Sequence, residues 1–432
     1  MALTFPTSPN LDDVYNNEDR TWKWNGRFWQ AISTTVGYTG SVGDPADFVS
    51  LQNVLYVAKN GNDTNTGVMT NPFLTIKAAL LAAAAGGKTV QVSPGTYTEN
   101  NPVTIPANVS LIGNDLRTVT VRPANPSSDL FYVGAACYVW GITIRDYAAN
   151  GFAYNPATPT QNVFVSPYIQ NITSTTTAAG ATAVKIDGNL TSAISTKAMI
   201  LGFFTMINRN GIGIHLTNRA YSQSVNCYSI ATDIGVLAES GSFITLNGSD
   251  SSIGNYGLKA VGTGPQEATG NTYGVSTVGI FVLRDLTSDP HVNHTMTIDG
   301  DPNFYSIDDI LKIDSVTWQV TIQEIYTPQL PSGTVVRFYQ RSAIIASAHT
   351  FEYVGAGTNP ATALPQYGGI PIAANEVVMS SGGRVTVTST DHKGNFKIGN
   401  TLTINQATGT ISGDAFTKSM FALMTPFILA LQ

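Results

Sequence analysis

The side chains best suited to chemistry on a carbohydrate are four carboxylates and two cations: Asp187, Asp233, Glu239, Asp250, Arg209 and Arg219. A glycosidase needs two carboxyl groups about 5 to 9.5 Å apart in one groove. Asp187-Gly188-Asn189 is typical of a turn, and Ser249-Asp250-Ser251 of a solvated loop. None of these residues recurs at a spacing that would bring two to one face. The sequence therefore supports no catalytic constellation and predicts a protein that is not primarily an enzyme.

A second group of residues could bind a metal ion. His291 and His294 form an HxxH pattern, and four aspartates follow it: Asp299, Asp301, Asp308 and Asp309. Zinc sites use three or four ligands at known spacings, and Asp299-Gly300-Asp301 lacks the other ligands of a calcium loop. Glycine motifs that bind phosphates or dinucleotides do not occur. We therefore expect neither a metal site nor a cofactor, and interpret these residues as ordinary loop residues.

The composition favours an all-β protein with neutral polar faces. Charged residues make up 12% of the 432 residues, about half the usual share of roughly 25%. The formal net charge is −6, and the 22 Lys and Arg residues are scattered singly. Proteins that bind nucleic acids carry a basic patch or stripe, so this partner is not expected.

Export, membrane insertion and disulfide formation are not expected either. Residues 1–10 lack the basic and apolar regions of a secretory signal. No apolar run reaches the roughly 18 residues of a membrane span, which predicts no membrane insertion and synthesis in a cytoplasm. Cys137 and Cys227 stand in apolar alternating contexts, which predicts buried free thiols.

A repeat of 22 residues is the main evidence for architecture. Strand-like segments begin at Gly213, Gly235 and Gly257, and an earlier pair at Val109 and Phe131 has the same offset. A repeat of this length with several short strands is what one coil of a parallel β-helix needs. One coil cannot bury its inward residues alone, so stacked coils must share a core.

One helix is predicted before these strands. Asn71 is a suitable N-cap residue and Pro72 suits the first helical position. Strong helix formers follow, and Gly86-Gly87 can adopt the left-handed conformation that ends a helix. Such a helix would cover the open apolar end of the first coil.

The N-terminal 50 residues are rich in aromatic side chains. Apolar residues alternate on both sides of Asn25-Gly26, which predicts a β-hairpin. Trp22, Trp24 and Trp29 either build the core of this small unit, which we favour, or form a stacking platform for attachment or glycan contact. The period is not visible in residues 280–345, where longer strands predict a separate β-rich domain. The expected divisions are therefore 1–50, 51–279, 280–345 and 346–432.

Four early segments resemble the opening of pectate-lyase-like right-handed β-helix proteins. The matching order is 56–63, the predicted helix at 71–79, Pro94-Gly95-Thr96-Tyr97 within 90–99, and Leu111-Ile112-Gly113 within 105–113. The resemblance implies a right-handed parallel β-helix with a capping helix. It implies no particular activity, because that fold hosts lyases, hydrolases and inert spikes alike.

Both ends of the chain resemble modules of tailed-phage virion and tail-fibre proteins, especially those of marine cyanophages. Six C-terminal segments carry this resemblance: 349–357, 375–378, 383–385, 388–391, 394–399 and 404–410. At the N-terminus, residues 5–9 and 22–26 are similar to a short module of such proteins. The resemblance implies a homotrimeric structural or adhesion part of the virion.

The last residues form an apolar tail, too short for a membrane span and interrupted by Pro426. Left exposed, it would be an aggregation liability, so it should pack on its own domain or, as we expect, in an oligomer interface. The expected interface residues are Phe416, Met420, Phe421, Leu423, Met424, Phe427, Ile428, Leu429 and Leu431.

The sequence as a whole predicts an all-β, right-handed parallel β-helix flanked by small β-rich domains. The expected role is that of a homotrimeric tail-fibre, spike or baseplate-associated protein of a phage virion, serving as shaft and in host adhesion. Its expected partners are its own copies, other tail or baseplate proteins, and host cell-surface polysaccharide. Two alternatives stay open: a polysaccharide depolymerase tailspike, and an internal virion connector without host contact.

Overall fold

The computed structural model describes two units, Met1–Gln52 and Asn53–Gln432. Within them, the described residues are 6–17, 20–24, 26–32, 53–157, 165–188, 197–252, 254–274, 276, 278–352, 366–367, 370–371, 376–387, 392–393, 403–405 and 410–412.

The first unit is a three-stranded antiparallel sheet of β1 (Val14–Asn17), β2 (Arg20–Trp24) and β3 (Trp29–Ile32). This confirms the predicted hairpin. Its register places Trp24 opposite Trp29, so the connection spans four residues instead of the two of Asn25-Gly26. The longer connection leaves the two indoles on one face, with ring centroids 5.6 Å apart.

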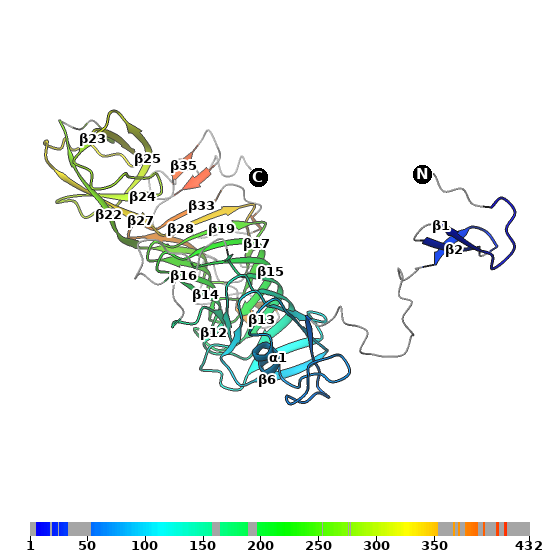
Figure 1. Cartoon of the computed structure of the whole chain (residues 1–432). Coiled ribbons are helices and arrows are strands. Elements are labelled where there is room, and N and C mark those ends of the chain that lie inside the picture. The colour runs from blue at the N-terminus through cyan, green and yellow to red at the C-terminus, as the bar shows by residue number, and fades with distance from the viewer. Residues whose placement is uncertain are drawn as a thin grey trace. The chain divides into compact units, whose positions relative to one another are not determined.

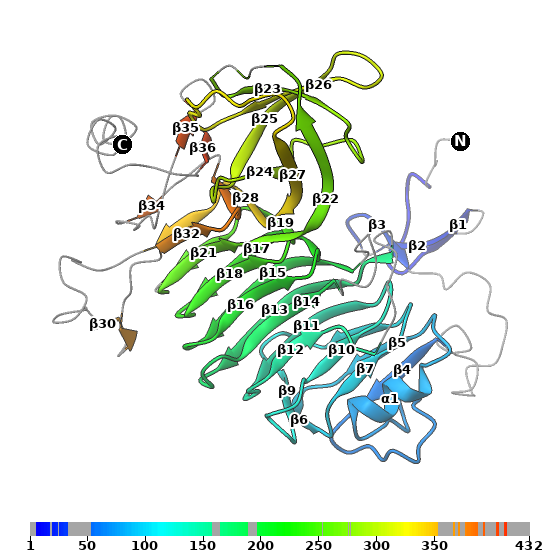
Figure 2. The same ribbon diagram turned by 90° about the vertical axis from the view of Figure 1, so that its left-hand side faces the viewer.

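The second unit is built on two long parallel sheets that alternate along the chain, as Figures 1 and 2 show. Sheet 1 contains β7 (Val103–Ile105), β10 (Phe131–Val133), β12 (Asn150–Ala153), β14 (Thr182–Asp187), β16 (Ile212–Thr217), β18 (Ile234–Glu239), β21 (Tyr256–Val261) and β32 (Glu376–Ser380). Sheet 2 contains β4 (Val54–Val57), β5 (Thr89–Val92), β8 (Ser110–Gly113), β11 (Tyr138–Arg145), β13 (Tyr168–Thr176), β15 (Ala198–Asn208), β17 (Tyr221–Ile230), β19 (Phe243–Asn247), β28 (Ala343–Ser347) and β33 (Arg384–Val387). This is the predicted right-handed parallel β-helix.

Sheet 2 is bent. The long strands β11 to β17 each turn a corner. After the corner, β9 (Val119–Pro123) pairs with β11, and β20 (Asp250–Ser252) pairs with β17. The same row of short strands continues with β6 (Gly95–Glu99) beside β9, and with β29 (Thr350–Glu352) and β34 (His392–Lys393) beyond β20. Gly141, Asn171, Phe203, Asn226 and Gly248 stand at this corner, all with positive φ. Glycine and asparagine tolerate that conformation, whereas a phenylalanine there is strained.

The 22-residue repeat is confirmed where it was clearest. Ile212 pairs with Ile234, and Ile234 pairs with Tyr256, in successive strands of sheet 1. The earlier pair with the same offset was wrong, because Ser110 pairs with Tyr138 in sheet 2, whereas Phe131 belongs to sheet 1. Loops between the sheets differ in length, so equal spacing in the sequence does not always mean the same position in the coil.

Inward side chains of successive coils form one continuous core. On β11, Val139, Ile142 and Ile144 are fully buried, and Ile142 pairs with the fully buried Ile172 of β13. Phe131 and Phe152 stack with centroids 5.3 Å apart in sheet 1. Cys137 and Cys227 are both buried free thiols, as predicted.

The helix covers the beginning of this core, but it starts later than predicted. α1 spans Ile76–Ala82, its N-cap is Thr75, and it buries Ile76, Ala79 and Leu80. Asn71 and Pro72 do not begin it, because Phe73 bridges Val57 in an extended conformation. Gly86 and Gly87 adopt positive φ after the helix, as expected. Among the described residues, no helix is long and apolar enough to cross a membrane.

Side chains from neighbouring loops fix the start of α1. Asp63 Oδ1 accepts hydrogen bonds from the backbone nitrogens of Leu74 (2.9 Å) and Thr75 (2.8 Å). The buried Glu99 carboxylate accepts from the backbone nitrogens of Ile76 (2.8 Å) and Lys77 (3.1 Å). These groups are the unpaired donors of a helix start, so Glu99 ties the helix to β6.

An antiparallel barrel is inserted between two coils. It contains β22 (Thr263–Thr272), β23 (Ile280–Arg284), β24 (His294–Ile298), β25 (Tyr305–Lys312), β26 (Trp318–Ile322) and β27 (Val335–Arg341), with its own core around Phe281, Val320 and Phe338. It begins at Thr263, before the predicted boundary at residue 280, because β22 continues directly from β21 and pairs with β27.

The β-helix resumes after the barrel instead of ending there. β28 pairs with β19, although Phe243 and its partner Ala343 are separated by the whole inserted barrel. β32 and β33 then add to sheets 1 and 2, so β28, β32 and β33 belong to further coils where the sequence suggested the start of a terminal module. Two short pairs complete the described strands: β30 (Gln366–Tyr367) with β31 (Ile370–Pro371), and β35 (Thr403–Asn405) with β36 (Thr410–Ser412).

Removing the Glu99 carboxylate should destabilise the capped end. Glu99→Ala leaves two buried backbone donors without their acceptor, and we expect a loss of about 2–3 kcal/mol in the free energy of unfolding. Glu99→Gln retains one acceptor oxygen and should lose less. Urea denaturation measures both, and equal effects of the two substitutions would contradict this role.

A buried histidine predicts sensitivity to acid. His349 is fully buried, and its Nε2 lies 3.1 Å from Ser251 Oγ. Burial lowers the pKa of the imidazole to about 3, from about 6.5 in the unfolded chain. The unfolded state therefore binds more protons between these values, and stability is lost as the pH falls from about 6.5 towards 3, by up to about 1.4 kcal/mol per pH unit. Urea midpoints should fall less steeply with acid in His349→Gln than in the wild-type chain. Parallel curves would contradict the prediction.

Candidate functional site

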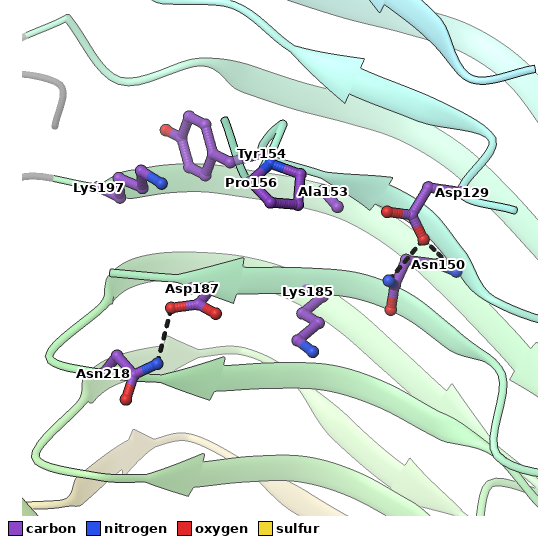
Figure 3. Close-up of a pocket in the computed structure, with 9 residues that line it drawn as sticks. All are labelled: Asp129, Asn150, Ala153, Tyr154, Pro156, Lys185, Asp187, Lys197 and Asn218. Carbon is purple, nitrogen blue, oxygen red and sulfur yellow. Dashed lines mark hydrogen bonds between the residues drawn. The ribbon is translucent and has the colours of Figure 1, made fainter. Parts of the chain in front are cut away.

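Ionisable side chains gather on the outer face of sheet 1, around a pocket of about 250 Å³. Figure 3 shows its lining: Asp129, Asn150, Ala153, Tyr154, Pro156, Lys185, Asp187, Lys197 and Asn218. The residues come from β12, β14 and the segments that follow β12 and β16 or precede β10 and β15. Parallel pairing brings them together, because outward positions of successive strands stack into rows.

Each carboxylate of the pocket is held by an asparagine amide, as the dashed lines in Figure 3 show. Asp129 Oδ1 accepts from Asn150 Nδ2 (2.6 Å) and from the Asn150 backbone nitrogen (3.1 Å). Asp187 Oδ1 accepts from Asn218 Nδ2 (2.8 Å). Each aspartate keeps further lone pairs that can accept from a ligand hydroxyl group.

The basic side chains of the pocket differ in setting. Lys185 is partly exposed on β14, whereas Lys197 is buried, with its Nζ 5.5 Å from the centroid of the Tyr154 ring. Burial lowers the pKa of the Lys197 ammonium, and the Asp187 carboxylate opposes this shift. Burial raises the pKa of the Tyr154 phenol, whose hydroxyl donates to the Ala198 carbonyl at 2.5 Å.

This arrangement can bind a polar ligand with several hydroxyl or carboxylate groups. Carboxylates accept from sugar hydroxyls, lysines attract uronate groups, and a lysine with a lowered pKa is suited to proton transfer. A buried ionisable group in a pocket is a candidate functional residue on physical grounds alone.

Asp187 is the one residue of the six sequence candidates that lines this pocket. Asp187 on β14 pairs with Thr217 on β16. The preceding residue, Leu216, pairs with Ala238 on β18, so Glu239 lies beside Thr217. Asp187 and Glu239 therefore stand in one outward row, two strands apart. The sequence search for recurring carboxylates missed this relation, because β14 and β16 are offset by 30 residues at Thr182 and Ile212, not by 22. Glu239 is bonded to His215 Nε2 at 2.9 Å.

The other four sequence candidates do not join the pocket. Asp233 Oδ1 accepts from Asn255 Nδ2 (2.7 Å), and the buried Asp250 accepts from the Ser252 hydroxyl. Arg209 bridges Thr232 at an exposed turn. Arg219 instead reaches the inserted barrel.

Four ionisable lining residues were missed from the sequence: Asp129, Tyr154, Lys185 and Lys197. Tyr154 lies within the stretch 147–183, where the 22-residue pattern breaks, and Lys185 follows it closely. The interruption of the repeat was itself a signal, since Tyr154 and Lys185 lie on or beside strands whose spacing departs from 22 residues.

A second ionic cluster joins the β-helix to the barrel. Glu267 of β22 lies 2.5 Å from Arg219 Nη2 and 2.7 Å from His294 Nε2. His294 and His291 contact each other with centroids 5.3 Å apart. Burial lowers the pKa of His294, and the Glu267 carboxylate opposes this. The HxxH pair thus belongs to a structural contact, and the described residues contain no group of three metal-binding side chains.

The nearby aspartates also have partners within the barrel. Asp299 pairs with Arg337 (2.9 Å), and Asp301 accepts from Tyr305 and Asn303. Asp308 accepts a weak bond from Gln323 at 3.3 Å, and Asp309 lies on β25.

The three tryptophans of the first unit pack together with Tyr15. Trp22 is buried, with its ring 6.0 Å from that of Tyr15, whereas Trp24 and Trp29 are half-buried. These contacts build a small core, and a role of these side chains in attachment or glycan contact stays a prediction. The apolar tail 416–432, which holds all nine expected oligomer contacts, lies outside the described residues.

Comparison with known proteins relates the chain to several others. A family model described as "Protein of unknown function (DUF1565)" matches residues 59–120, the segment that contains α1 and the first coils. No curated protein matches the sequence.

Several solved structures are similar at low identity. Pectin methylesterase PemA from Erwinia chrysanthemi is 10% identical over 69% of this chain and 78% of its own, with a TM-score of 0.34. A rhamnogalacturonan lyase is 11% identical over 50% and 77%, with a TM-score of 0.31. ORF18 of Geobacillus virus E2 is 10% identical over 76% and 86%, with a TM-score of 0.26.

The Glu267 cluster should hold the barrel on the β-helix. Glu267→Gln removes the charge shared by Arg219 and His294, and we expect a loss of about 2 kcal/mol in unfolding free energy, because a charge-assisted hydrogen bond is worth about 1.5–3 kcal/mol. The control Asp289→Asn disrupts an exposed pair with Lys312 at 3.9 Å and should change stability by less than about 0.5 kcal/mol. Limited proteolysis should also cut the junctions near residues 262 and 342 faster in Glu267→Gln alone. Equal behaviour of the two variants would contradict the role of the cluster.

Proposed function

We propose that the chain is a structural component of a phage virion, a homotrimeric tail-fibre, spike or baseplate-associated protein that serves as shaft and in host adhesion. The observation that carries the proposal is the uninterrupted stack of coils, which continues on both sides of the inserted barrel. From β4 to β28 sheet 2 has nine strands in order, which at about 4.8 Å each gives a stiff body about 40 Å long.

The inserted barrel suits a part that makes contact at the side of a shaft. It has its own core, so it can change its loops without disturbing the coils. Three exposed apolar side chains, Leu311, Ile313 and Val316, lie at the connection between β25 and β26. Neighbouring exposed apolar side chains are typical of contact surfaces.

The ends of the chain supply the remaining support. The resemblance of residues 5–9 and 22–26 to virion modules favours attachment to the particle at the N-terminus. The similar resemblance of the C-terminal segments, with the apolar tail, favours trimer formation there. Three copies would hold three weak receptor contacts together, so that avidity exceeds the affinity of one site.

A polysaccharide depolymerase is the second candidate, and the pocket on sheet 1 is the observation that favours it. Asp129, Asp187 and Lys197 offer acceptors and a proton-transfer group within one cavity. In this version the same shaft would cut the host polysaccharide that it binds.

Light scattering and labelling of particles test the structural proposal. The purified full chain should have about three times the mass of one 45.8 kDa chain. Gold-labelled antibodies against it should mark the tail or baseplate of intact particles. A monomer at all concentrations, or labelling of the capsid alone, would overturn the proposal. Binding only after particles are opened would favour the internal connector.

Incubation with purified host capsule or lipopolysaccharide separates adhesion from depolymerisation. An adhesive shaft binds these polymers and leaves their length unchanged. Shorter products that disappear in Lys197→Ala and Asp187→Asn, but persist in Glu267→Gln, would favour the depolymerase.

A further inference from the structure

Two outward rows on the first halves of the sheet 2 strands carry no charge over the length of the stack. One outward row passes in register through Ile112, Trp140, Gln170, Gly202, Val225 and Asn247. The row continues to Tyr56 on β4 at one end and to Ser347 on β28 at the other. No residue of this row in the described strands is charged.

The neighbouring row, two residues earlier on each strand, is also neutral. It contains Tyr138, Tyr168, Ile200, Gln223 and Thr245. We call these two rows the neutral face. Sheet 1 is different, since its strands present Lys185, Asp187, His215, Glu239 and Lys259 at partly exposed positions. Charged residues therefore stand on the sheet 1 side of the coils and are missing from the neutral face.

Large apolar side chains on the neutral face are open to solvent. The exposed fractions are 37% for Trp140, 47% for Tyr168 and 37% for Val225. Phe203, at the adjoining corner, is 58% exposed. An extended uncharged face with exposed aromatic residues at two successive coils is typical of a surface that another protein covers.

Phe203 adds an independent observation. It has a φ of +50° at a corner where the other four coils place glycine or asparagine. That left-handed conformation is unfavourable for a phenylalanine, and its exposed ring gains little from burial in its own chain. Strain of this kind is typical of positions retained for a contact.

We infer that the neutral face is the surface through which copies of this chain pack against one another, an inference that rests on the proposed oligomeric function. In a trimer whose threefold axis runs along the stack, the neutral faces of the three copies would meet around that axis. A charged residue close to the axis would lie near the same charge of the other two copies, whereas a neutral face has no charge to desolvate.

The size of the face suits part of an interface with a second copy. Nine strands at about 4.8 Å, each contributing about three residues at roughly 3.3 Å, cover on the order of 400 Å². A stable interface buries roughly 800 Å² on each partner. The neutral face thus supplies about half of the contact area that an oligomer needs, and the apolar tail would add to it.

Placing a charge on the face tests the inference. Val225→Arg and Trp140→Arg should each raise the apparent dissociation constant of assembly at least about tenfold, measured by sedimentation of the full chain over a dilution series. Thr104→Arg is the matched control, because Thr104 is an exposed outward residue on β7 of sheet 1. It should assemble as the wild type does, and all three should keep the wild-type far-UV spectrum.

Phe203→Asn distinguishes a contact role of Phe203 from a structural one, because it should change chain stability and assembly in opposite directions. Asparagine suits the left-handed corner, so the dissociated chain should resist urea better than wild-type chain at the same dilution. Assembly should nevertheless weaken, because the exposed ring is lost. If stability and assembly change in the same direction, the contact role of Phe203 is wrong.

The outcomes separate this inference from the proposed function. A wild-type chain that is monomeric overturns both. A wild-type trimer that Val225→Arg and Trp140→Arg leave intact overturns the neutral face alone, and dissociation by Phe421→Asp would then assign the contact to the tail. Loss of binding to host polysaccharide in Trp140→Arg with an unchanged trimer would identify the face as a glycan surface and likewise overturn the inference.

Discussion

The structure depends on inward apolar side chains that one coil cannot bury alone. Val139 on β11 and Ile169 on β13 pair in successive coils, and both are removed from solvent only because the next coil lies over them. Each coil is therefore stabilised by its neighbours, and a coil at either end of the stack lacks a neighbour on one side. At the first end, α1 with Ile76 and Leu80 buried replaces the missing neighbour.

The inserted barrel shows that a coil needs only its direct neighbour in space to cover its core, and not the next segment of the sequence. The chain leaves the stack after β21 and returns as β28, yet β19 and β28 pair as directly as any two successive strands. A domain with its own core can be accommodated between coils because its two connections lie close together, and Glu267 links it to Arg219 at the junction. The loop closure costs little, since the barrel is itself folded.

The outer faces are free of the packing requirement, and there the two sheets diverge. Sheet 1 presents a pocket with Asp187 and Lys197, whereas sheet 2 presents rows of neutral and aromatic residues around Trp140. One stack of coils thus carries a polar side with a pocket and a neutral side with exposed aromatic residues. Inward positions decide the fold, and outward positions are left to decide function.

The sequence by itself determined the coil architecture, the capping helix and the hairpin near Trp24, because their signals are local: a period, a cap and a turn. Tertiary structure alone decided where the stack of coils is interrupted and where it resumes. Return of β28 to β19 is a pairing across the whole barrel, which no local pattern contains. The same holds for the pocket, because Asp129 and Lys197 lie far apart in sequence and meet only when loops of unequal length bring successive strands into register.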